Sequence, residues 1–247
     1  MSYLIIGASS GLGRDLSYSF AKKKNDLILV ARDKKDLEAI KSDIEIKHNV
    51  SVNTITADLS SLDNINLQLF SDEEIYKNLK GVLFPIGHMF ENDNVNLNIK
   101  NIQSIICSNY LSITYIVSKL AKYFSSSSNF SIVGFGSVSG IIGRKVNSNY
   151  AASKRALESY FESLGFENIG NNINIQFYIL GYLNTNLSFG QNLNLPKGST
   201  KKLSLIVLKN INKKFKKKYY PFFWSIIVFL LKVIPFSFII KLNKFFK

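Results

Sequence analysis

Short apolar runs alternate with longer amphipathic segments along most of the chain. The runs that predict strands cover 3–6, 27–31, 50–57, 81–86, 130–135 and 173–179. The segments that predict helices cover 14–24, 34–48, 60–79, 101–124 and 199–215, and a further helix carries residues 150–154. This alternation is typical of βαβ units, which build a parallel sheet with helices on both faces. The pattern therefore predicts an α/β fold with a doubly wound parallel sheet in a single domain.

Glycines and polar residues follow the predicted strands. Those at or just beyond a strand's end are Gly7, Arg32, Asp58, Gly87, Ser137 and Thr185. The carboxyl ends of parallel strands meet at one edge of a sheet, and the ligands of such sheets bind there. We expect one crevice at this edge to collect these residues.

The turn after the first strand is rich in glycine. Its candidate ligand-binding residues are Gly7, Ser9, Ser10, Gly11, Leu12 and Gly13. Glycines let the backbone approach a pyrophosphate at a helix N-terminus, where free N–H groups attract anions. The spacing G-x-x-x-G-x-G differs from the commoner dinucleotide-binding spacing G-x-G-x-x-G, so an ordinary turn without a ligand is the alternative.

Two later turns contain residues suited to the adenosine part of a dinucleotide. Arg32 and Asp33 lie about 20 residues beyond the glycines, where an acid favours NAD and an arginine favours NADP. Because Arg32 comes first after its strand, we expect NADP, with NAD as the alternative. A simply solvated Arg32 is a third interpretation. Asp58 suits either the adenine edge or a helix N-cap.

Tyr150 and Lys154 form the strongest candidate for catalysis. Residues four apart share one helix face, so the phenol and the ammonium can point into the same site. A free tyrosine has a pKa of about 10, and a nearby cation favours its phenolate and so makes proton exchange easier. A solvated surface pair is the alternative for an isolated match of this kind.

Composition narrows the class of partner and the compartment. The net charge is +14, but residues 1–167 carry 18 basic and 17 acidic side chains, whereas 168–247 carry 13 lysines and no acid. No nucleic-acid-binding motif accompanies these lysines, which disfavours nucleic acid as a partner. His48 and His88 have no second ligand at metal spacing. The single Cys107 cannot form an internal disulfide, and no signal peptide precedes the first strand, so we expect a cytoplasmic protein.

The order of these motifs resembles the short-chain dehydrogenase/reductase family over about residues 1–223. The glycine turn opens the first βα unit as in that family, and Tyr150-x-x-x-Lys154 matches its catalytic pair. Ser137 precedes the tyrosine by thirteen residues, the family's usual separation. The resemblance implies a Rossmann-like fold and a nicotinamide cofactor.

Three other positions match family motifs. Asn109 matches the asparagine of the family's long interface helix, and Asp58 matches the residue at the adenine. Thr185 matches the threonine after a Pro-Gly turn. Ser139 is the alternative to Ser137 as the substrate-binding serine, although its spacing to the tyrosine is shorter.

The resemblance also implies a role for each catalytic residue. Tyr150 would donate a proton to a carbonyl oxygen as hydride arrives from the nicotinamide. Lys154 would hold the nicotinamide ribose and lower the tyrosine pKa. Ser137 would bind the substrate oxygen, and Asn109 would anchor a water that relays protons.

Two stretches depart from the family pattern. The family's Asn-Asn-Ala-Gly after the fourth strand is replaced here by Phe84-Pro85-Ile86-Gly87, and its Pro-Gly turn by Leu180-Gly181. Neither change removes a group that does chemistry, so we expect activity with an unusual nicotinamide pocket. A catalytically idle relative is the alternative.

The C-terminal end is basic and apolar. Lysines at 213–218 precede a predicted last strand at 219–223, and apolar segments follow at 224–231 and 233–240. Lys232 and Pro235 interrupt what would otherwise be a membrane span. We expect 1–223 to form the enzyme domain and 224–247 to lie in the membrane interface, with lysines of 213–247 at lipid headgroups. A true span and a packed core or dimer helix are the alternatives.

These observations predict an NADPH-dependent oxidoreductase, attached peripherally to the cytoplasmic face of a membrane. It would reduce a carbonyl, or oxidise the alcohol, of a hydrophobic or lipid-linked substrate, and relatives of this kind are commonly homo-oligomers. A non-catalytic nucleotide-sensing membrane protein is one alternative. A sugar epimerase or dehydratase on the same fold is another, although those relatives usually carry a longer substrate domain.

Overall fold

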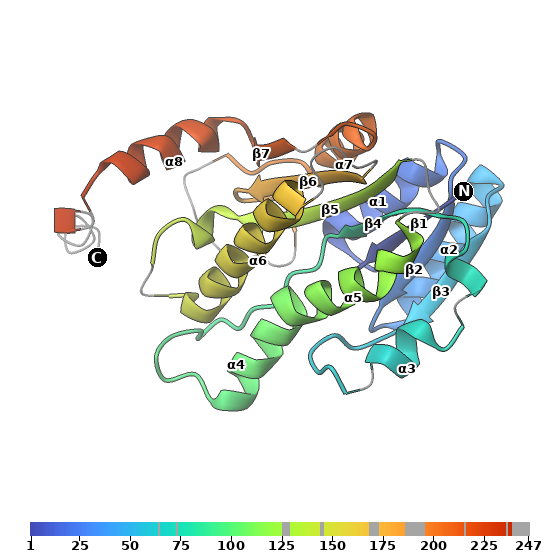
Figure 1. Ribbon diagram of the computed structural model, residues 1–247, viewed down its shortest axis with the longest axis horizontal. Coiled ribbons are helices and arrows are strands. Elements are labelled where there is room, and N and C mark those ends of the chain that lie inside the picture. The colour runs from blue at the N-terminus through green and yellow to red at the C-terminus, as the bar shows by residue number, and fades with distance from the viewer. Residues whose placement is uncertain are drawn as a thin grey trace.

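Seven parallel strands form one sheet in the order β3-β2-β1-β4-β5-β6-β7 (Figure 1). The computed structural model describes residues 1–63, 65–72, 74–124, 129–143, 146–167, 173–185, 196–214, 216–235 and 237–238. The strands are β1 (Ser2–Ile6), β2 (Asp26–Ala31), β3 (Val52–Thr56), β4 (Leu79–Phe84), β5 (Phe130–Ser137), β6 (Ile173–Leu180) and β7 (Lys216–Tyr220). The chain winds from β1 first to one edge and then, through β4, to the other. The predicted doubly wound, Rossmann-like fold is confirmed.

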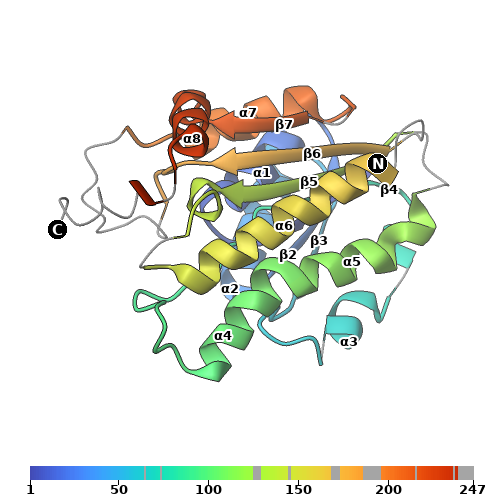
Figure 2. The same ribbon diagram turned by 60° about the vertical axis from the view of Figure 1, so that its left-hand side comes forward.

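Helices cover both faces of the sheet, as Figures 1 and 2 show. One face carries α3 (Ile65–Phe70), α4 (Ile99–Ile106), α5 (Ser112–Leu120) and α6 (Ser148–Glu167). The other carries α1 (Gly11–Ala21), α2 (Lys34–His48) and α7 (Thr200–Asn210), and α8 (Phe223–Val233) follows β7. Two apolar cores lie between the sheet and these helices, one on each side of the sheet.

The continuous apolar strands are buried on both faces. Along β1, Leu4 and Ile6 pack into the core beneath α5 and α6, whereas Tyr3 and Ile5 pack into the core beneath α1 and α2. Successive side chains of a strand point to opposite faces, so both sets must be apolar when helices cover both sides. This requirement explains why the strands read as unbroken apolar runs.

The winding reverses between β1 and β4, which are neighbours in the sheet. The turns that follow these strands meet there: a Cβ atom placed on Gly7 would lie 3.3 Å from the Cα atom of Ile86. A crevice beyond the carboxyl ends is expected where the strand order reverses. This geometry sets the position of the cavity described below.

The last strand begins three residues earlier than the sequence predicted. β7 runs over Lys216–Tyr220 instead of 219–223 and pairs in parallel with β6. Lys217 is accommodated because its ammonium forms ion pairs with Glu158 and, at 2.7 Å, with Glu162 on α6. Pro221 cannot donate a backbone hydrogen bond, and α8 begins two residues later.

The predicted long helix over 101–124 is divided. A π-helical segment over Cys107–Leu111 separates α4 from α5, and a short 3₁₀ segment over Ala121–Tyr123 ends the run. π-helical turns of this kind are frequent at functional sites, and this one contains Asn109. The division therefore places the asparagine at an irregular turn.

The C-terminal segment is helical over α8, which covers the predicted apolar segment 224–231. Residues 236, 239 and 240 of the second apolar segment, 233–240, and all of the tail after it lie outside the described residues. Of the helices within the described ranges, none is long and apolar enough to cross a bilayer. The boundary at residues 223 and 224 stays a prediction.

Gly134→Ala is expected to destabilise the fold through the packing of α6 on β5. The new Cβ atom would lie 2.5–2.7 Å from three ring carbons of Phe161, which is fully buried and has no room to move. Overpacking of this kind costs about 1–3 kcal/mol of unfolding free energy. Gly143→Ala is the matched control, since nothing lies within 4 Å of its Cβ position. Urea unfolding of both variants should separate them, and equal stabilities would contradict this account of the packing.

Candidate active site

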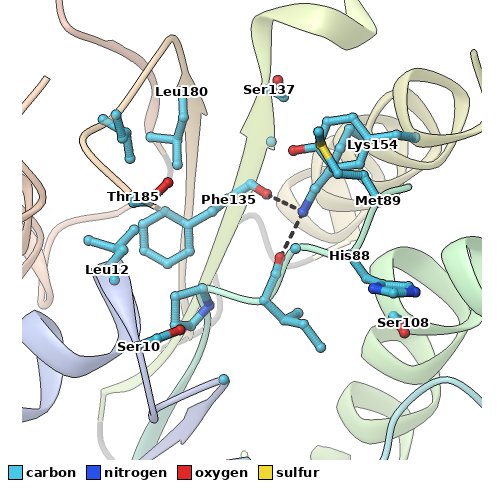
Figure 3. Close-up of a pocket in the computed structure, with 18 of the residues that line it drawn as sticks. Ser10, Leu12, His88, Met89, Ser108, Phe135, Ser137, Lys154, Leu180 and Thr185 are labelled. Atoms are coloured by element: carbon cyan, nitrogen blue, oxygen red, sulfur yellow. Dashed lines mark hydrogen bonds between the residues drawn. The ribbon is translucent and has the colours of Figure 1, made fainter. Parts of the chain in front are cut away.

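A cavity of about 420 Å³ opens at the carboxyl ends of the central strands (Figure 3). Its walls come from the turns after β1, β2, β3, β4, β5 and β6 and from the first turns of α6. The predicted residues that line it are Gly7, Ser9, Ser10, Gly11, Leu12, Arg32, Asp58, Gly87, Ser137, Tyr150, Lys154 and Thr185. One cavity thus brings together side chains that are up to 178 residues apart in the chain.

The glycine turn has a conformation that favours glycine. Gly7 has a φ of +95° and Gly11 a φ of +49°, both in the left-handed region. A Cβ atom on Gly11 would lie 3.3 Å from the Cγ2 atom of Thr185, so the glycine turn and the turn after β6 are in close contact. Ser10 is the N-cap of α1, and among the described residues its side chain makes no capping bond. The start of α1 therefore presents backbone N–H groups beside the cavity.

Two predicted site residues do not line the cavity. Gly13 lies behind the turn, where a Cβ atom would overlap the carbonyl oxygen of Gly7, so its role in the structure is the close packing of α1 on β1. Asn109 also lies behind the wall, whereas its neighbour Ser108 lines the cavity. The spacing of motifs alone does not distinguish a residue of the wall from one that supports it.

Asn109 holds the turn after β4 in place. Its Oδ1 atom accepts a hydrogen bond from the N–H of His88 at 2.8 Å, and its Nδ2 atom donates to the carbonyl oxygen of His88 at 2.7 Å. A further bond from Nδ2 reaches the Oγ atom of Ser153 on α6 at 3.1 Å. The amide thereby joins the π-helical segment, the β4 turn and α6. The predicted role in anchoring a water stays a prediction.

Lys154 is inserted between the ends of two central strands. Its ammonium donates to the carbonyl oxygen of Ile86 at 2.9 Å and to that of Phe135 at 3.1 Å, the two bonds drawn in Figure 3. The Nζ atom lies 5.9 Å from the centre of the Tyr150 ring. Burial lowers the pKa of Lys154 to about 7. A lysine with that pKa exchanges protons readily near neutral pH.

Ser137 lies at the end of β5 with its hydroxyl oriented by Ser139. The Ser137 oxygen accepts bonds from the Ser139 hydroxyl at 2.7 Å and from the Ser139 N–H at 3.2 Å. The hydrogen of the Ser137 hydroxyl is therefore the one left to donate to a ligand atom. Both serines line the cavity, so the structure keeps both in contention as substrate-binding residues.

One part of the cavity wall contains Arg32, Asp58 and His88. The Asp58 carboxylate accepts a bond from the N–H of Ser60 at 3.0 Å. Asp33, the residue that favoured NAD in the sequence, caps α2 by accepting a bond from the N–H of Asp36 at 3.0 Å. Of the two neighbouring residues, only Arg32 lines the cavity.

His88 also lines the cavity, although the sequence did not predict it as a site residue. Its imidazole lines the site, and burial together with the charge of Arg32 lowers the pKa of His88 below its usual value. The available signal was its position directly after Gly87, at a strand's carboxyl end. Pro85, Ile86 and Met89 give the same wall an apolar character. In the part of the chain that the structure describes, no cluster of metal-ligating side chains occurs.

The chain was compared with models of protein families. The model of the short chain dehydrogenase family matches residues 2–194. The chain belongs to this family. Among its relatives is an 11-beta-hydroxysteroid dehydrogenase-like protein of Arabidopsis thaliana, 32% identical over 196 residues, a match that covers 76% of this chain and 61% of that one. The chain thus spans about three fifths of that relative's length.

Two other similar proteins extend the comparison. An NADP-dependent 3-hydroxy acid dehydrogenase of Schizosaccharomyces pombe is 30% identical, with 75% of this chain and 72% of that one covered. The solved structure of a short-chain dehydrogenase from Sphingobium yanoikuyae in complex with NADPH has a TM-score of 0.79 at 24% identity, and 95% and 96% of the two chains are covered. The likeness of the structures confirms the fold of this short-chain dehydrogenase.

Lys154→Met is expected to remove a pH dependence of stability. Because the pKa of Lys154 falls from 10.5 to about 7 on folding, the unfolded chain binds more protons between these values. Wild-type stability should therefore rise with pH in this window, relative to the variant, by at most about 1.4 kcal/mol per pH unit. Urea unfolding between about pH 7 and pH 9 measures the difference. Lys22→Met, at an exposed lysine, should show the same pH dependence of stability as the wild type. If the stability difference between the wild type and Lys154→Met did not change with pH, the lowered pKa of Lys154 would be contradicted.

Proposed function

We propose that this short-chain dehydrogenase is an NADP(H)-dependent oxidoreductase that reduces a carbonyl group, or oxidises the corresponding alcohol, on a hydrophobic substrate. One observation carries the proposal. Tyr150, Lys154 and Ser137 line the same cavity as the glycine turn and Arg32. A candidate proton donor and a glycine turn suited to a dinucleotide thereby line one open cavity, whose volume is within the size range of ligand sites.

The walls of the cavity fit a dinucleotide. Backbone N–H groups at the start of α1 would hold the pyrophosphate, and the conformations of Gly7 and Gly11 allow a close approach. Arg32 would bind the 2′-phosphate, and Asp58 would contact the adenine. Lys154 would hold the nicotinamide ribose with the N–H hydrogen that its two carbonyl partners leave available.

The choice of NADP over NAD rests on which of two side chains is available. Asp33 is engaged at the N-terminus of α2, and Arg32 lines the cavity. A guanidinium binds a phosphate through strong charge-assisted hydrogen bonds. The NADP-dependent relative from Schizosaccharomyces pombe and the Sphingobium yanoikuyae structure, solved with NADPH, agree with this choice.

The reaction needs a proton at the substrate oxygen. The bound nicotinamide supplies or accepts the hydride. Tyr150 donates the phenolic proton to the carbonyl oxygen, and Ser137 donates a hydrogen bond to the same atom, stabilising the charge that develops there. Lys154, next to the tyrosine, favours the phenolate after the proton has left and can pass on a proton near neutral pH.

A hydrophobic substrate suits the lining of the cavity. Its apolar residues include Pro85, Ile86, Met89, Val138, Leu180, Tyr182 and Leu183. Such a surface favours an aliphatic or ring-fused substrate over a polar sugar, which disfavours the epimerase alternative. The name of the Arabidopsis relative, a hydroxysteroid dehydrogenase-like protein, agrees with a substrate of this class.

We also propose that α8 docks this enzyme on a membrane surface. Trp224 and Val228 are buried on the inner side of the helix, whereas Ile226, Phe229 and Leu230 are more than half exposed. Apolar side chains exposed on one face, with lysines in the flanking chain, are typical of interfacial helices.

The buried side of α8 packs on residues that also line the cavity. The Trp224 indole packs so tightly over Gly181 that a Cβ atom there would overlap it, and the ring also contacts Tyr182 at a centroid distance of 5.8 Å. Both Gly181 and Tyr182 line the cavity. A lipophilic substrate could therefore pass from the bilayer to the active site over a short path. The predicted homo-oligomer stays a prediction.

Tyr150→Phe is expected to abolish most turnover while NADPH binding persists. The change removes the proton donor and keeps the ring, so kcat should fall by about 10²–10⁴-fold. Tyr182→Phe is the matched control, because it removes a second phenol from the same cavity and should have a small effect. The assay is NADPH oxidation against steroid ketones, 3-oxoacyl thioesters and long-chain ketones. Wild-type turnover by Tyr150→Phe would contradict the mechanism.

Phe229→Glu is expected to weaken binding to vesicles. Phe229 is 67% exposed on α8, and placing a carboxylate there opposes insertion and repels anionic headgroups. Losing the burial of one phenylalanine corresponds to about a tenfold or greater loss of affinity. Sedimentation with phosphatidylcholine vesicles containing phosphatidylserine measures it. Val95→Glu, at a residue 95% exposed before α4, should bind like the wild type; no vesicle binding by the wild type would refute the docking proposal.

A further inference from the structure

A buried carboxylate from a distant loop lies at the start of the helix that carries Tyr150. Asp93, between β4 and α4, is 1% exposed. Its Oδ2 atom accepts a hydrogen bond from the N–H of Tyr150 at 2.7 Å. Its Oδ1 atom accepts bonds from the N–H and the side-chain amide of Asn149, at 3.1 and 2.7 Å, and from the Ser148 hydroxyl at 3.5 Å.

The backbone of the same residue completes the contact. The carbonyl oxygen of Asp93 accepts a bond from the N–H of Ser148 at 3.3 Å. Asp93 therefore binds the N–H groups of three successive residues at the start of α6. The first N–H groups of a helix have no partner within the helix, and the side chain of the residue that directly precedes the helix commonly caps them. Here the cap comes from 55–57 residues away.

The energetics favour a negative charge at this point. A carboxylate without solvent is costly unless donors surround it, and Asp93 has four on its side chain. The positive end of the helix dipole adds to their effect. Asn147, the residue before α6, has a φ of +59°, so the chain turns sharply just before the helix begins.

The two catalytic residues of α6 are held in different ways. Lys154, one turn after Tyr150, is fixed by its own bonds to carbonyl oxygens at the ends of β4 and β5. Tyr150 is the third residue of α6, in the turn where helices fray most readily. The Asp93 carboxylate holds the backbone of Tyr150 directly. Without it, the tyrosine could shift relative to both Lys154 and Ser137.

We propose that Asp93 is a positioning residue for Tyr150, and that it fixes the first turn of α6 so that the phenol meets the substrate oxygen. The proposal rests on the proposed function of Tyr150 as the proton donor. Misplacing a reacting group by about 1 Å can cost about 10²-fold in rate. The described hydrogen bonds of the Asp93 carboxylate all reach residues 148–150, and none reaches the glycine turn or Arg32, so its removal should lower kcat through Tyr150 and leave NADPH affinity unchanged.

The test compares Asp93→Ala and Asp93→Asn with the wild type well below their melting temperatures. Asp93→Ala should lower kcat by about 10–100-fold, with the Kd for NADPH within about twofold of the wild type. Asp93→Asn keeps one acceptor oxygen and should recover part of the loss, and it provides the measurement if the alanine variant does not fold. Wild-type kcat in a folded variant of either kind would overturn the proposal.

A matched control separates positioning from ordinary helix capping. Asn98 caps α4 by accepting a bond from the N–H of Asn101 at 2.9 Å. Asn98→Ala should lower the melting temperature by about 2–4 °C without changing kcat. An equal fall in kcat for Asn98→Ala and Asp93→Ala would mean that capping in general, and not the bond to Tyr150, sets the rate, and would also overturn the proposal.

Hydrogen exchange keeps the proposal testable if the wild type reduces no carbonyl compound. That result would count against the proposed function and not against the contact. The peptide containing Tyr150 should then exchange its amide hydrogens at least about tenfold faster in Asp93→Asn than in the wild type, and at an unchanged rate in Asn98→Ala. Unchanged protection of that peptide in Asp93→Asn would refute the role of Asp93.

Discussion

The active site depends on the insertion of the Lys154 ammonium between the ends of β4 and β5. The bonds to the carbonyl oxygens of Ile86 and Phe135 tie α6 to the two central strands and fix one end of the cavity. Burying a charge is costly, and the pKa of about 7 reflects that cost. The bonds to the two carbonyl oxygens offset part of that cost, and they hold the ammonium 5.9 Å from the centre of the Tyr150 ring.

The fold could be predicted because its information is local. Largely apolar, buried runs specify β1, β2, β4, β5 and β6, an alternating run specifies the edge strand β3, and the residues after the strands specify the site's edge of the sheet. The start of β7 could not be predicted, because three consecutive lysines do not read as a strand. Only the acids of α6, far away in the sequence, make Lys217 acceptable there.

The site could be predicted as a set of residues but not as an arrangement. Motif spacing found the residues of the wall, and it also selected Gly13 and Asn109, which support the wall from behind. Contacts between distant segments leave no signal in one sequence. Two contacts are of this kind: the Asp93 carboxylate accepts a bond from Tyr150 at the start of α6, and the Trp224 indole packs over Gly181. Tyr150 and Gly181 both line the cavity.

The most direct test of the account is a fluorescence titration of the purified wild-type protein with NADPH and with NADH. We expect saturable binding of NADPH at one site per chain, with a Kd between about 1 μM and 1 mM. NADH should bind at least about tenfold more weakly, because it lacks the phosphate that Arg32 would contact. Equal affinities would overturn the role of Arg32. The absence of saturable binding by either nucleotide would contradict the assignment of the cavity as a dinucleotide site.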